Sequence, residues 1–296
     1  MTSIAFIGLG NMGGPMAANL VQAGYRVAGF DLVSSSLEAA TLAGIAVKPS
    51  AIEAVVGADV VITMLPAGKH VRAVWAELLG HAKPHALFMD CSTVDVESAR
   101  AVHAEAKAMG LPSLDAPVSG GTGGAKGATL TFMVGGEDAA FATGKPILEK
   151  MGKKIVHCGM GGAGQAAKIC NNMILGISMV AVGEAFVLAE KLGLSHQALF
   201  DVASTSSGQC WSLTTYCPVP GPVPTSPANN GYKPGFAADL MLKDLRLSQE
   251  AAAAAGAATP LGAGAAKLYA QFQEAGFGAE DFSGMVNYLR TMERLA

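Results

Sequence analysis

Charge and cysteine are both scarce in this chain. Asp, Glu, Lys and Arg make up only 15% of its 296 residues, and the formal net charge is −3. Such a chain has no broad basic surface for nucleic acid or anionic lipid, so we expect neither partner. The five cysteines are scattered and form no C-x-x-C pair, which argues against a metal site and against a disulfide framework. We expect reduced thiols in a cytoplasmic protein.

The sequence also lacks an obvious targeting or membrane-spanning segment. Thr2 and Ser3 lead directly into the apolar run 4–7, without the basic start and cleavage site of a signal peptide. The most apolar long segment, 173–189, contains two glycines and Glu184 and is short for a membrane span. With 51% hydrophobic residues, the composition is that of a globular protein, and we interpret this segment as a buried helix.

The first half of the chain alternates short β-rich runs with amphipathic segments. Most of the runs are continuously apolar, which suits a parallel sheet covered by helices on both faces. This succession predicts a doubly wound, Rossmann-type α/β domain. The predicted strands are 4–7, 26–30, 60–64, 86–89, 129–134 and 154–157, with crossover helices including 15–22 and 94–109.

The character of the sequence changes at the Gly-rich segment 159–164. Strand-like runs end there, and a long helical segment follows from Gln165 to about Leu192. We therefore expect an α/β domain over 1–163 and an all-α domain over 164–296, joined by a long interdomain helix. A polar, Pro-rich stretch at 204–235 interrupts the second domain, and a loop of that length is usually functional or disordered.

The first predicted strand runs into a G-x-G-x-x-G motif and then into a helix. The motif comprises Gly8, Gly10, Asn11, Met12 and Gly13 together with Leu9. Such glycines permit a tight turn, a close approach of the backbone to a pyrophosphate, and close packing of helix on strand. The N–H groups at the start of the helix then face the phosphates. We predict a dinucleotide site here.

Asp31 indicates which dinucleotide is bound. It ends the next predicted strand, 18 positions after Gly13. A carboxylate there accepts hydrogen bonds from the ribose 2′-hydroxyl and repels a 2′-phosphate, and no arginine occurs in 32–36 to bind that phosphate. The expected cofactor is NAD.

Four blocks of the sequence together resemble the β-hydroxyacid dehydrogenases. They occur in the order of that family and span nearly the whole chain. The blocks are Ile4-Ala5-Phe6-Ile7-Gly8-Leu9-Gly10-Asn11-Met12-Gly13, Asp115-Ala116-Pro117-Val118-Ser119-Gly120-Gly121, Gly164-Gln165-Ala166-Ala167-Lys168-Ile169-Cys170-Asn171-Asn172, and Lys243-Asp244-Leu245. The resemblance implies an oxidoreductase that acts on a small hydroxy acid.

The resemblance also implies the catalytic residue. In this family a lysine on the interdomain helix is catalytic, and Lys168 takes that place. Asn172 lies four positions later, so the two side chains share one face of a helix. A lysine general base must lose its proton near neutral pH, and desolvation or a nearby cation such as Lys243 would lower its pKa.

Other site residues follow from the same blocks. Ser119, Gly120 and Gly121 follow a strand end, where backbone N–H groups and a hydroxyl can hold the substrate carboxylate. The family lines its cofactor cleft at the positions of Leu65, Pro66, Thr93 and Lys243, with Asp244 as an orienting neighbour. For Lys243, an ordinary helix ion pair with Asp239 is the competing interpretation. Trp211, Tyr216 and Phe236 line the pocket or simply pack in the core.

The segment 206–211 and the Pro-rich loop after it most resemble family members that oxidise 3-hydroxyisobutyrate to methylmalonate semialdehyde in valine breakdown. The alternatives are the same chemistry on L-serine, or on glycerate and tartronate semialdehyde, and a non-catalytic NAD-binding module on the same fold. A helix that is apolar on all sides is normally buried, and a two-domain monomer leaves part of it to be covered, so we expect an oligomer. The family resemblance implies a homodimer or homotetramer.

Overall fold

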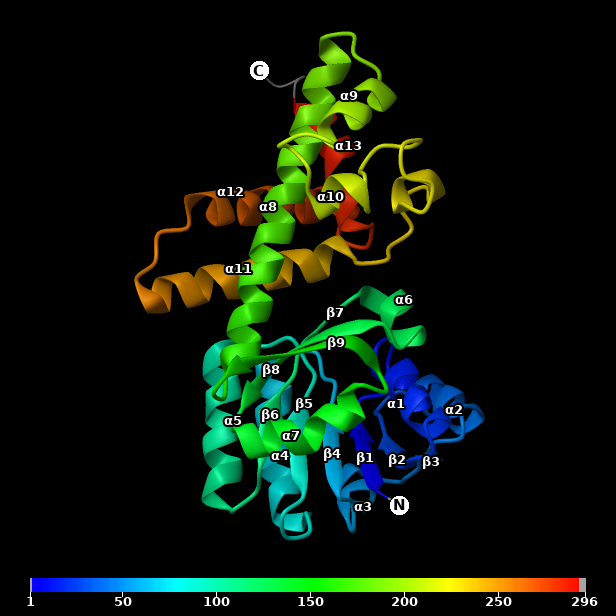
Figure 1. Ribbon diagram of the computed structural model, residues 1–296, viewed down its shortest axis with the longest axis vertical. Coiled ribbons are helices and arrows are strands. Elements are labelled where there is room, and N and C mark those ends of the chain that lie inside the picture. The colour runs from blue at the N-terminus through cyan, green and yellow to red at the C-terminus, as the bar shows by residue number, and fades with distance from the viewer. Residues whose placement is uncertain (1, 293–296) are drawn as a thin grey trace. The chain divides into compact units, whose positions relative to one another are not determined.

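The computed structural model describes residues 2–292. The chain divides into two compact units, one ending at Lys168 and the other beginning at Ile169. The first unit contains every strand of the described sheet, and the second is helical (Figure 1). The fold is therefore an α/β domain followed by an all-α domain, as the sequence predicts.

The first unit is built on a nine-stranded sheet in the order β3-β2-β1-β4-β5-β6-β8-β7, with β9 paired to β8. The strands are β1 (Ser3–Ile7), β2 (Arg26–Phe30), β3 (Ala46–Val47), β4 (Val60–Thr63), β5 (Leu87–Asp90), β6 (Ser113–Asp115), β7 (Val118–Ser119), β8 (Leu130–Gly136) and β9 (Gly152–Gly159).

The six strands from β3 to β6 in this order run parallel. Their last residues therefore lie at one end of the sheet, which we call the carboxyl end, and their first residues lie at the amino end. The strand order reverses at β1, which pairs with β2 on one side and β4 on the other. Open α/β sheets bind ligands at the carboxyl end beside such a reversal.

The last part of the sheet departs from the predicted parallel arrangement. Strand β8 runs antiparallel to both β6 and β7, while β9 runs parallel to β8. A parallel crossover needs a dozen or more residues, usually with a helix. The segment between β7 and β8 holds only the short helix α6 (Gly121–Lys126), so the chain returns antiparallel.

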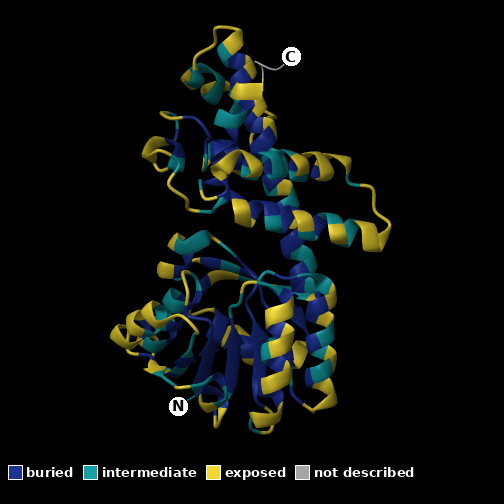
Figure 2. Cartoon of the chain, turned by 180° about the vertical axis from the view of Figure 1, so that it is seen from behind, coloured by how far each residue is buried: buried dark blue, intermediate teal, exposed yellow. Residues whose placement is uncertain are grey.

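Helices cover both faces of the sheet, which explains the continuously apolar strands. In β1, Ile4 and Phe6 pack toward one face and Ala5 and Ile7 toward the other, and all four are buried. Figure 2 shows buried strands between helices whose outer sides are exposed. The first face is covered by α1 (Gly13–Gln22), α2 (Ser34–Leu42) and α7 (Asp138–Leu148), and the second by α3 (Ala51–Val55), α4 (Gly68–Leu78) and α5 (Val96–Ala108).

The second unit is a helical domain with its own core. Phe186, Met241, Tyr269 and Phe282 are fully buried there, and α11 and α12 lie side by side. Its helices are the long α8 (Ala163–Lys191), which begins in the first unit, then α9 (His196–Ala203), α10 (Trp211–Thr214), α11 (Ala238–Ala255), α12 (Pro260–Phe272) and α13 (Met285–Met292). Short turns η1 (Leu79–His81), η2 (Pro227–Asn230), η3 (Gln273–Phe277) and η4 (Phe282–Gly284) complete the described elements.

Helix α8 is long and apolar enough to cross a membrane by length and composition alone. Half of its most apolar window is buried within the protein, however, and Met179, Val182 and Phe186 belong to the core of the second unit. The core helix of a soluble protein has the same properties. We therefore interpret α8 as a core helix.

The Pro-rich segment 204–235 is ordered. Val219 is fully buried, the Tyr232 hydroxyl donates to the Pro218 carbonyl over 2.8 Å, and the Asn229 amide donates to the Val223 carbonyl over 2.8 Å. Side-chain hydrogen bonds to the backbone replace the regular structure that the prolines prevent. Of the two interpretations of this long loop, a functional or a disordered segment, disorder does not agree with these contacts.

Candidate active site

The G-x-G-x-x-G motif forms the turn between β1 and α1. Gly8 has a φ of +95°, and a Cβ at this position would lie 2.2 Å from the Met64 carbonyl oxygen. A Cβ at Gly13 would lie 1.9 Å from the carbonyl oxygen of Gly8. Gly10, by contrast, is exposed and faces open space. The first and last glycines are thus required by packing, whereas Gly10 leaves the backbone accessible to a ligand.

Asp31 follows β2 and is fixed beside this turn. Its carboxylate accepts hydrogen bonds from the backbone N–H of Leu9 over 2.6 Å and of Val33 over 2.8 Å. These bonds hold the side chain next to the glycine turn and leave further lone pairs on both oxygens. Asp31 therefore presents acceptors to hydroxyl groups of a molecule bound over the turn.

Buried hydrogen bonds connect the segments after β4 and β5 at the carboxyl end of the sheet. The Ser92 hydroxyl accepts from the Leu65 N–H over 2.7 Å and donates to Asp90 over 2.6 Å. The Thr63 hydroxyl donates to the same Asp90 oxygen over 2.7 Å. Burial raises the pKa of Asp90 to about 6, against the lowering effect of these bonds. These buried hydrogen bonds thus fix the backbone beside the proposed cofactor residues Leu65, Pro66 and Thr93.

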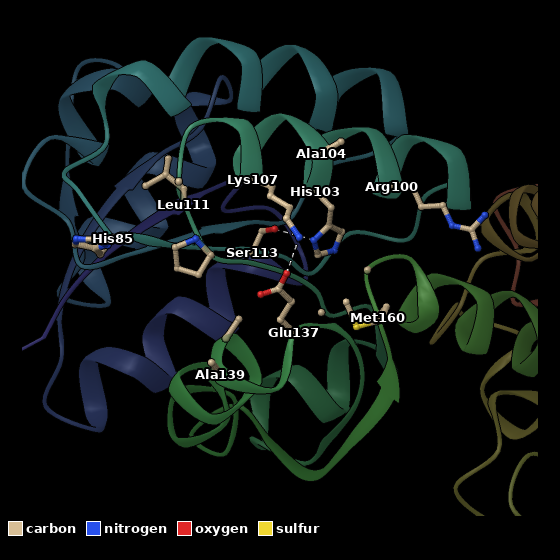
Figure 3. A pocket seen from close by; sticks show the side chains of 15 residues that line it. His85, Arg100, His103, Ala104, Lys107, Leu111, Ser113, Glu137, Ala139 and Met160 are labelled. Atoms are coloured by element: carbon tan, nitrogen blue, oxygen red, sulfur yellow. Dashed lines mark hydrogen bonds and ion pairs between the residues drawn. The ribbon is translucent and has the colours of Figure 1, made fainter.

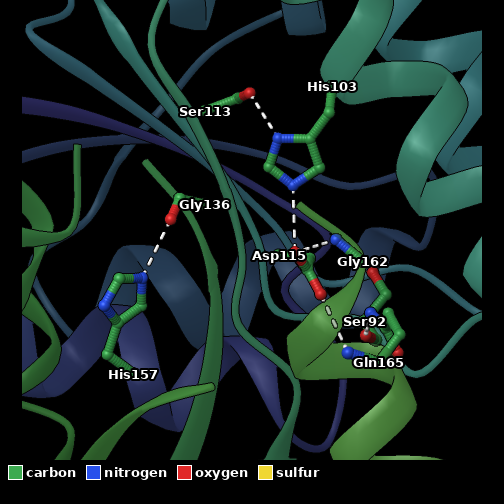
Figure 4. Close-up of polar contacts among 8 residues, drawn as sticks. All are labelled: Ser92, His103, Ser113, Asp115, Gly136, His157, Gly162 and Gln165. Atoms are coloured by element: carbon green, nitrogen blue, oxygen red, sulfur yellow. Dashed lines mark hydrogen bonds and ion pairs between the residues drawn. The ribbon is translucent and has the colours of Figure 1, made fainter. Parts of the chain in front are cut away.

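The first turn of α8 is bonded to the same end of the sheet (Figure 4). Asp115 accepts from the N–H groups of Gly162 and Gln165, each over 2.8 Å. The Gln165 amide donates to the Ser92 carbonyl over 2.8 Å. Lys168 follows one turn later and is only 6% exposed. A lysine this deeply buried is unusual and is commonly functional.

Asn172 lies one further turn along α8 and is 2% exposed. Its amide donates to the buried carboxylate of Asp244 on α11, and its carbonyl oxygen accepts from the Asn171 amide over 2.9 Å. Both ends of the Asn172 side chain are therefore oriented. Lys243, next to Asp244, is partly exposed. Asp239, the competing ion-pair partner considered for Lys243, accepts a hydrogen bond from the Gln273 amide over 2.6 Å.

Ser119, Gly120 and Gly121 lie where β7 passes into α6. Gly120 has a φ of +134° and Gly121 a φ of +61°, values that favour glycine. A Cβ at Gly120 would lie 3.1 Å from the Leu130 side chain. Ser119 and Gly121 are partly exposed and Gly120 is exposed, so hydroxyl and backbone groups of this turn are accessible.

The three aromatic candidates in the second unit contact each other or Phe282. The rings of Trp211 and Tyr216 are 4.9 Å apart, and both Tyr216 and Phe236 contact the ring of Phe282. Tyr216 also donates to the buried Asp281 over 2.9 Å, and burial raises the pKa of the Tyr216 phenol. Tyr216 is thus partly buried and packs against the core, whereas Trp211 is half exposed.

A cavity of about 540 Å³ lies elsewhere on the first unit (Figure 3). It is lined by α5, the turn before β6 and the start of α7, and includes Arg100, His103, Lys107 and Glu137. Lys107 and Glu137 form an exposed ion pair across it at 3.0 Å. None of the candidate site residues lines this cavity.

Sequence reasoning missed several residues that hold the site together. Asp90, Ser92, Asp115 and Gln165 are all buried polar residues at the carboxyl end of the sheet. Asp115 and Gln165 stand within blocks that carry the family resemblance, but no local pattern shows what they bond to. The available sequence signal was that Asp90 and Asp115 are polar residues at the ends of short strands.

Comparisons with known proteins agree with this geometry. Residues 3–159 match the NAD binding domain of 6-phosphogluconate dehydrogenase, and residues 162–289 match the family described as NAD-binding of NADP-dependent 3-hydroxyisobutyrate dehydrogenase. A probable 3-hydroxyisobutyrate dehydrogenase of Mycobacterium tuberculosis is 57% identical over 98% of both chains. An NAD-dependent L-serine dehydrogenase of Pseudomonas aeruginosa is 48% identical over 96% of both chains.

A solved structure gives the same result. The 3-hydroxyisobutyrate dehydrogenase of Mycobacterium tuberculosis, determined with L-serine, superposes with a TM-score of 0.95 at 56% identity, over 98% of this chain and 99% of that one. These likenesses extend over both units and far exceed what a shared fold requires. The chain therefore belongs to the 3-hydroxyisobutyrate dehydrogenase family and is an oxidoreductase with an NAD-binding domain.

Proposed function

We propose that this protein oxidises 3-hydroxyisobutyrate to methylmalonate semialdehyde with NAD, a step of valine degradation. The observation that carries the proposal is the buried Lys168 on α8, one turn after a helix start that is bonded to the carboxyl end of the sheet. Relatives that match over nearly the full chain include proteins named for this reaction.

The glycine turn fits a dinucleotide. Gly10 leaves open space beside the backbone, and the start of α1 supplies N–H groups for a pyrophosphate. Asp31 would hold the adenosine ribose through its remaining lone pairs and would repel a 2′-phosphate, which favours NAD over NADP. The other proposed cofactor residues lie in the turn, after two strands and on α11. They are Asn11 and Met12 in the turn, Leu65 and Pro66 after β4, Thr93 after β5, and Lys243 on α11.

The chemistry is divided between the cofactor and the chain. NAD, when bound, supplies the acceptor for the hydride that leaves the substrate's third carbon. Lys168, in its neutral form, takes the proton of the 3-hydroxyl as the carbonyl forms. Loss of this proton leaves electron density on the oxygen, and that density forms the C=O bond as the hydride leaves the carbon.

The chain also has groups to orient the hydroxy acid. Ser119, Gly120 and Gly121 would bind the carboxylate through a hydroxyl and accessible backbone N–H groups. Asn172 lies four positions after Lys168 on α8, and its bond to Asp244 fixes the side chain. Holding the substrate at two points lowers the entropic part of the barrier.

L-serine is the second candidate substrate. The Pseudomonas aeruginosa relative is named for it, and the Mycobacterium tuberculosis relative was solved with it. L-serine shares the carboxylate and the hydroxyl on the third carbon with 3-hydroxyisobutyrate and differs by an amino group in place of a methyl. Glycerate has the same two groups and is the third candidate.

We further infer a cytoplasmic homodimer or homotetramer. In the second unit, Ile174, Leu188 and Leu261 are each more than half exposed, and a subunit interface would remove such apolar side chains from water. The first domain, 1–163, would bind NAD, and the second, 164–296, would provide substrate contacts and the interface. Light scattering on the purified protein measures the number of subunits.

The test of the function is a comparison of substrates. Purified protein with NAD is assayed for NADH formation with (S)-3-hydroxyisobutyrate, L-serine and D-glycerate in parallel. We expect the highest kcat/KM for 3-hydroxyisobutyrate. A higher value for L-serine or glycerate would move the substrate and keep the mechanism. Tight NAD binding without turnover of any of the three would mean a non-catalytic NAD-binding module.

A further inference from the structure

We propose that Asp115 and His103 are positioning residues, which act through the first turn of α8 to place Lys168. The inference rests on the proposed role of Lys168 as the base. Neither residue is a candidate for contact with substrate or cofactor. Their effect on catalysis would come entirely from where they hold the helix.

Asp115 binds the N–H groups that a helix cannot satisfy itself. Helix α8 begins at Ala163, and the first N–H groups of any α-helix have no partner within the helix. Oδ1 of Asp115 accepts from Gly162 and Oδ2 accepts from Gln165, each over 2.8 Å. The carboxylate is 2% exposed, so water does not compete for these bonds. Its negative charge also lies at the positive end of the helix dipole.

His103 holds the carboxylate from a third direction (Figure 4). Its Nε2 lies 2.9 Å from Oδ1 of Asp115, and its Nδ1 lies 2.7 Å from the Ser113 hydroxyl. With one proton, on Nε2, the ring donates to Asp115 and accepts from Ser113. With two protons it donates to both, because the serine hydroxyl is also an acceptor. With a proton on Nε2, the ring therefore holds the Asp115 carboxylate through a donated hydrogen bond.

Gln165 and two glycines fix the same turn against the strands. The Gln165 side chain accepts from the Val94 N–H over 3.1 Å and donates to the Ser92 carbonyl over 2.8 Å. A Cβ at Gly164 would lie 2.3 Å from the Met133 carbonyl oxygen, and one at Gly135 would lie 2.4 Å from the Asp115 carboxylate. Backbone thus packs directly on backbone, and α8 has little freedom to rotate or slide at its start.

Lys168 follows Gln165 by three positions, within one helical turn. Because its side chain is buried, the placement of its amine depends on the placement of the helix. A misplacement of reacting groups by about 1 Å lowers turnover by roughly 100-fold. The buried Asp115 carboxylate is therefore in a position to affect turnover without touching the reacting atoms.

The test compares Asp115→Asn with matched variants in the wild-type substrate assay. An asparagine has one acceptor oxygen in place of two, so its amide group must face one of the three N–H donors. We expect kcat to fall by roughly 30- to 100-fold, as for displaced reacting groups. We expect the KM for NAD to stay within about 2-fold, since the glycine turn and Asp31 are untouched. The kinetic isotope effect with substrate deuterated at the third carbon should rise.

Variants of His103 separate positioning from folding. His103→Gln keeps an N–H donor near the position of Nε2 and should retain turnover within about 3-fold, whereas His103→Leu should lose roughly 10-fold, the size of one hydrogen bond to a charged group. Asp59→Asn removes an aspartate at the amino end of the sheet and should leave turnover unchanged. Thermal unfolding of each variant establishes that the fold persists.

A second measurement does not depend on activity. Hydrogen exchange of the amides over 162–172 should be faster in Asp115→Asn than in the wild type, with exchange over 3–31 unchanged. If the wild type oxidises none of the hydroxy acids, the proposed function fails while this measurement still tests the anchoring. Folded Asp115→Asn protein with wild-type kcat, or with wild-type exchange over 162–172, would overturn the proposal.

Discussion

The two ends of the parallel sheet use aspartate in different ways. At the amino end, Asp59 accepts from the N–H and the hydroxyl of Ser3 and pairs with Lys83, and these contacts hold the pKa of Asp59 well below its usual range. At the carboxyl end, Asp31 accepts from a backbone N–H group of the glycine turn, and Asp115 accepts from those at the start of α8. The first arrangement joins neighbouring strands, whereas the second orders a turn and a helix.

Asp90 shows that the carboxyl end is not arranged for stability alone. It pairs in register with Asp115 on the adjacent strand. Oδ1 accepts from Thr63 and Ser92, but Oδ2 is buried and has no hydrogen-bond partner among the described residues. Burial, aided by the charge of Asp115, raises the pKa of Asp90 to about 6. A buried carboxylate that lacks partners for one oxygen destabilises the fold, so the difference between the two ends has measurable consequences.

The largest expected difference in stability between the two ends comes from substituting one glycine at each end. Gly164→Ala places a Cβ 2.3 Å from the Met133 carbonyl oxygen, whereas Gly80, before β5 at the amino end, has open space around it. We expect Gly164→Ala to lower the free energy of unfolding by about 3 kcal/mol, because neither backbone can move easily. Gly80→Ala should change it by less than about 0.5 kcal/mol. Urea denaturation measures both, and equal effects would contradict the tight packing at the carboxyl end.

Asp31→Ala tests the carboxyl end as a cofactor site. Loss of the carboxylate removes hydrogen bonds to the ribose, so the KM for NAD should rise by roughly 10- to 100-fold, or about 1.4–2.8 kcal/mol. The KM for NADP should fall, because repulsion of the 2′-phosphate is removed. Initial rates with both cofactors measure this change. An unaltered preference for NAD over NADP would exclude Asp31 as the selecting residue.

Asp90→Asn tests the cost of the unsatisfied carboxylate. The folded-state pKa of Asp90 lies above its value in the unfolded chain, so its stabilising contribution is complete at low pH and is lost as the pH rises through about 6. A shift of about two units corresponds to at most about 3 kcal/mol. The stability of Asp90→Asn relative to wild type should therefore increase between pH 4 and pH 7.5. A stability difference that does not change with pH would contradict the raised pKa.

Asp59→Asn is expected to have the smallest effect. The pKa of Asp59 is lowered, so its pairing stabilises the fold at neutral pH and is lost as the pH falls below the usual range of a carboxylate. Both partners are more than one-third exposed, so solvent screens the pair and the contribution is about 1 kcal/mol or less. Urea denaturation at pH 7 and at pH 3 measures it. A loss of turnover in this variant would contradict the functional separation of the two ends.

The sequence was sufficient for the fold class and for the elements that carry the glycine motif. The apolar runs predict β1, β2, β4 and β5 because strands buried on both faces need apolar residues at every position. The Gly-rich segment at 159–164 correctly marks the end of the strands and the start of α8. The family, inferred from four sequence blocks, is confirmed by the comparisons.

Other features could not be read from the sequence. The direction of β8 depends on the length of its connection and not on its composition, and β3 and β7 are two residues each, too short to form a pattern. Asp115 contacts Gly162 and Gln165, which lie 47 and 50 positions away, so only the folded chain shows this bond. The roles of Lys168, Asn172 and the cofactor residues remain predictions, which the structure makes specific enough to test.

The most direct test of the central claim is the turnover of Lys168→Ala at saturating NAD, with NAD affinity measured by calorimetry in the same preparation. Removal of the general base should lower kcat for 3-hydroxyisobutyrate by roughly 10²–10⁴-fold, the range for general acid–base catalysis. The Kd for NAD should stay within about 2-fold, since the glycine turn and Asp31 are unchanged. Near-normal turnover in the variant would show that Lys168 is not the base.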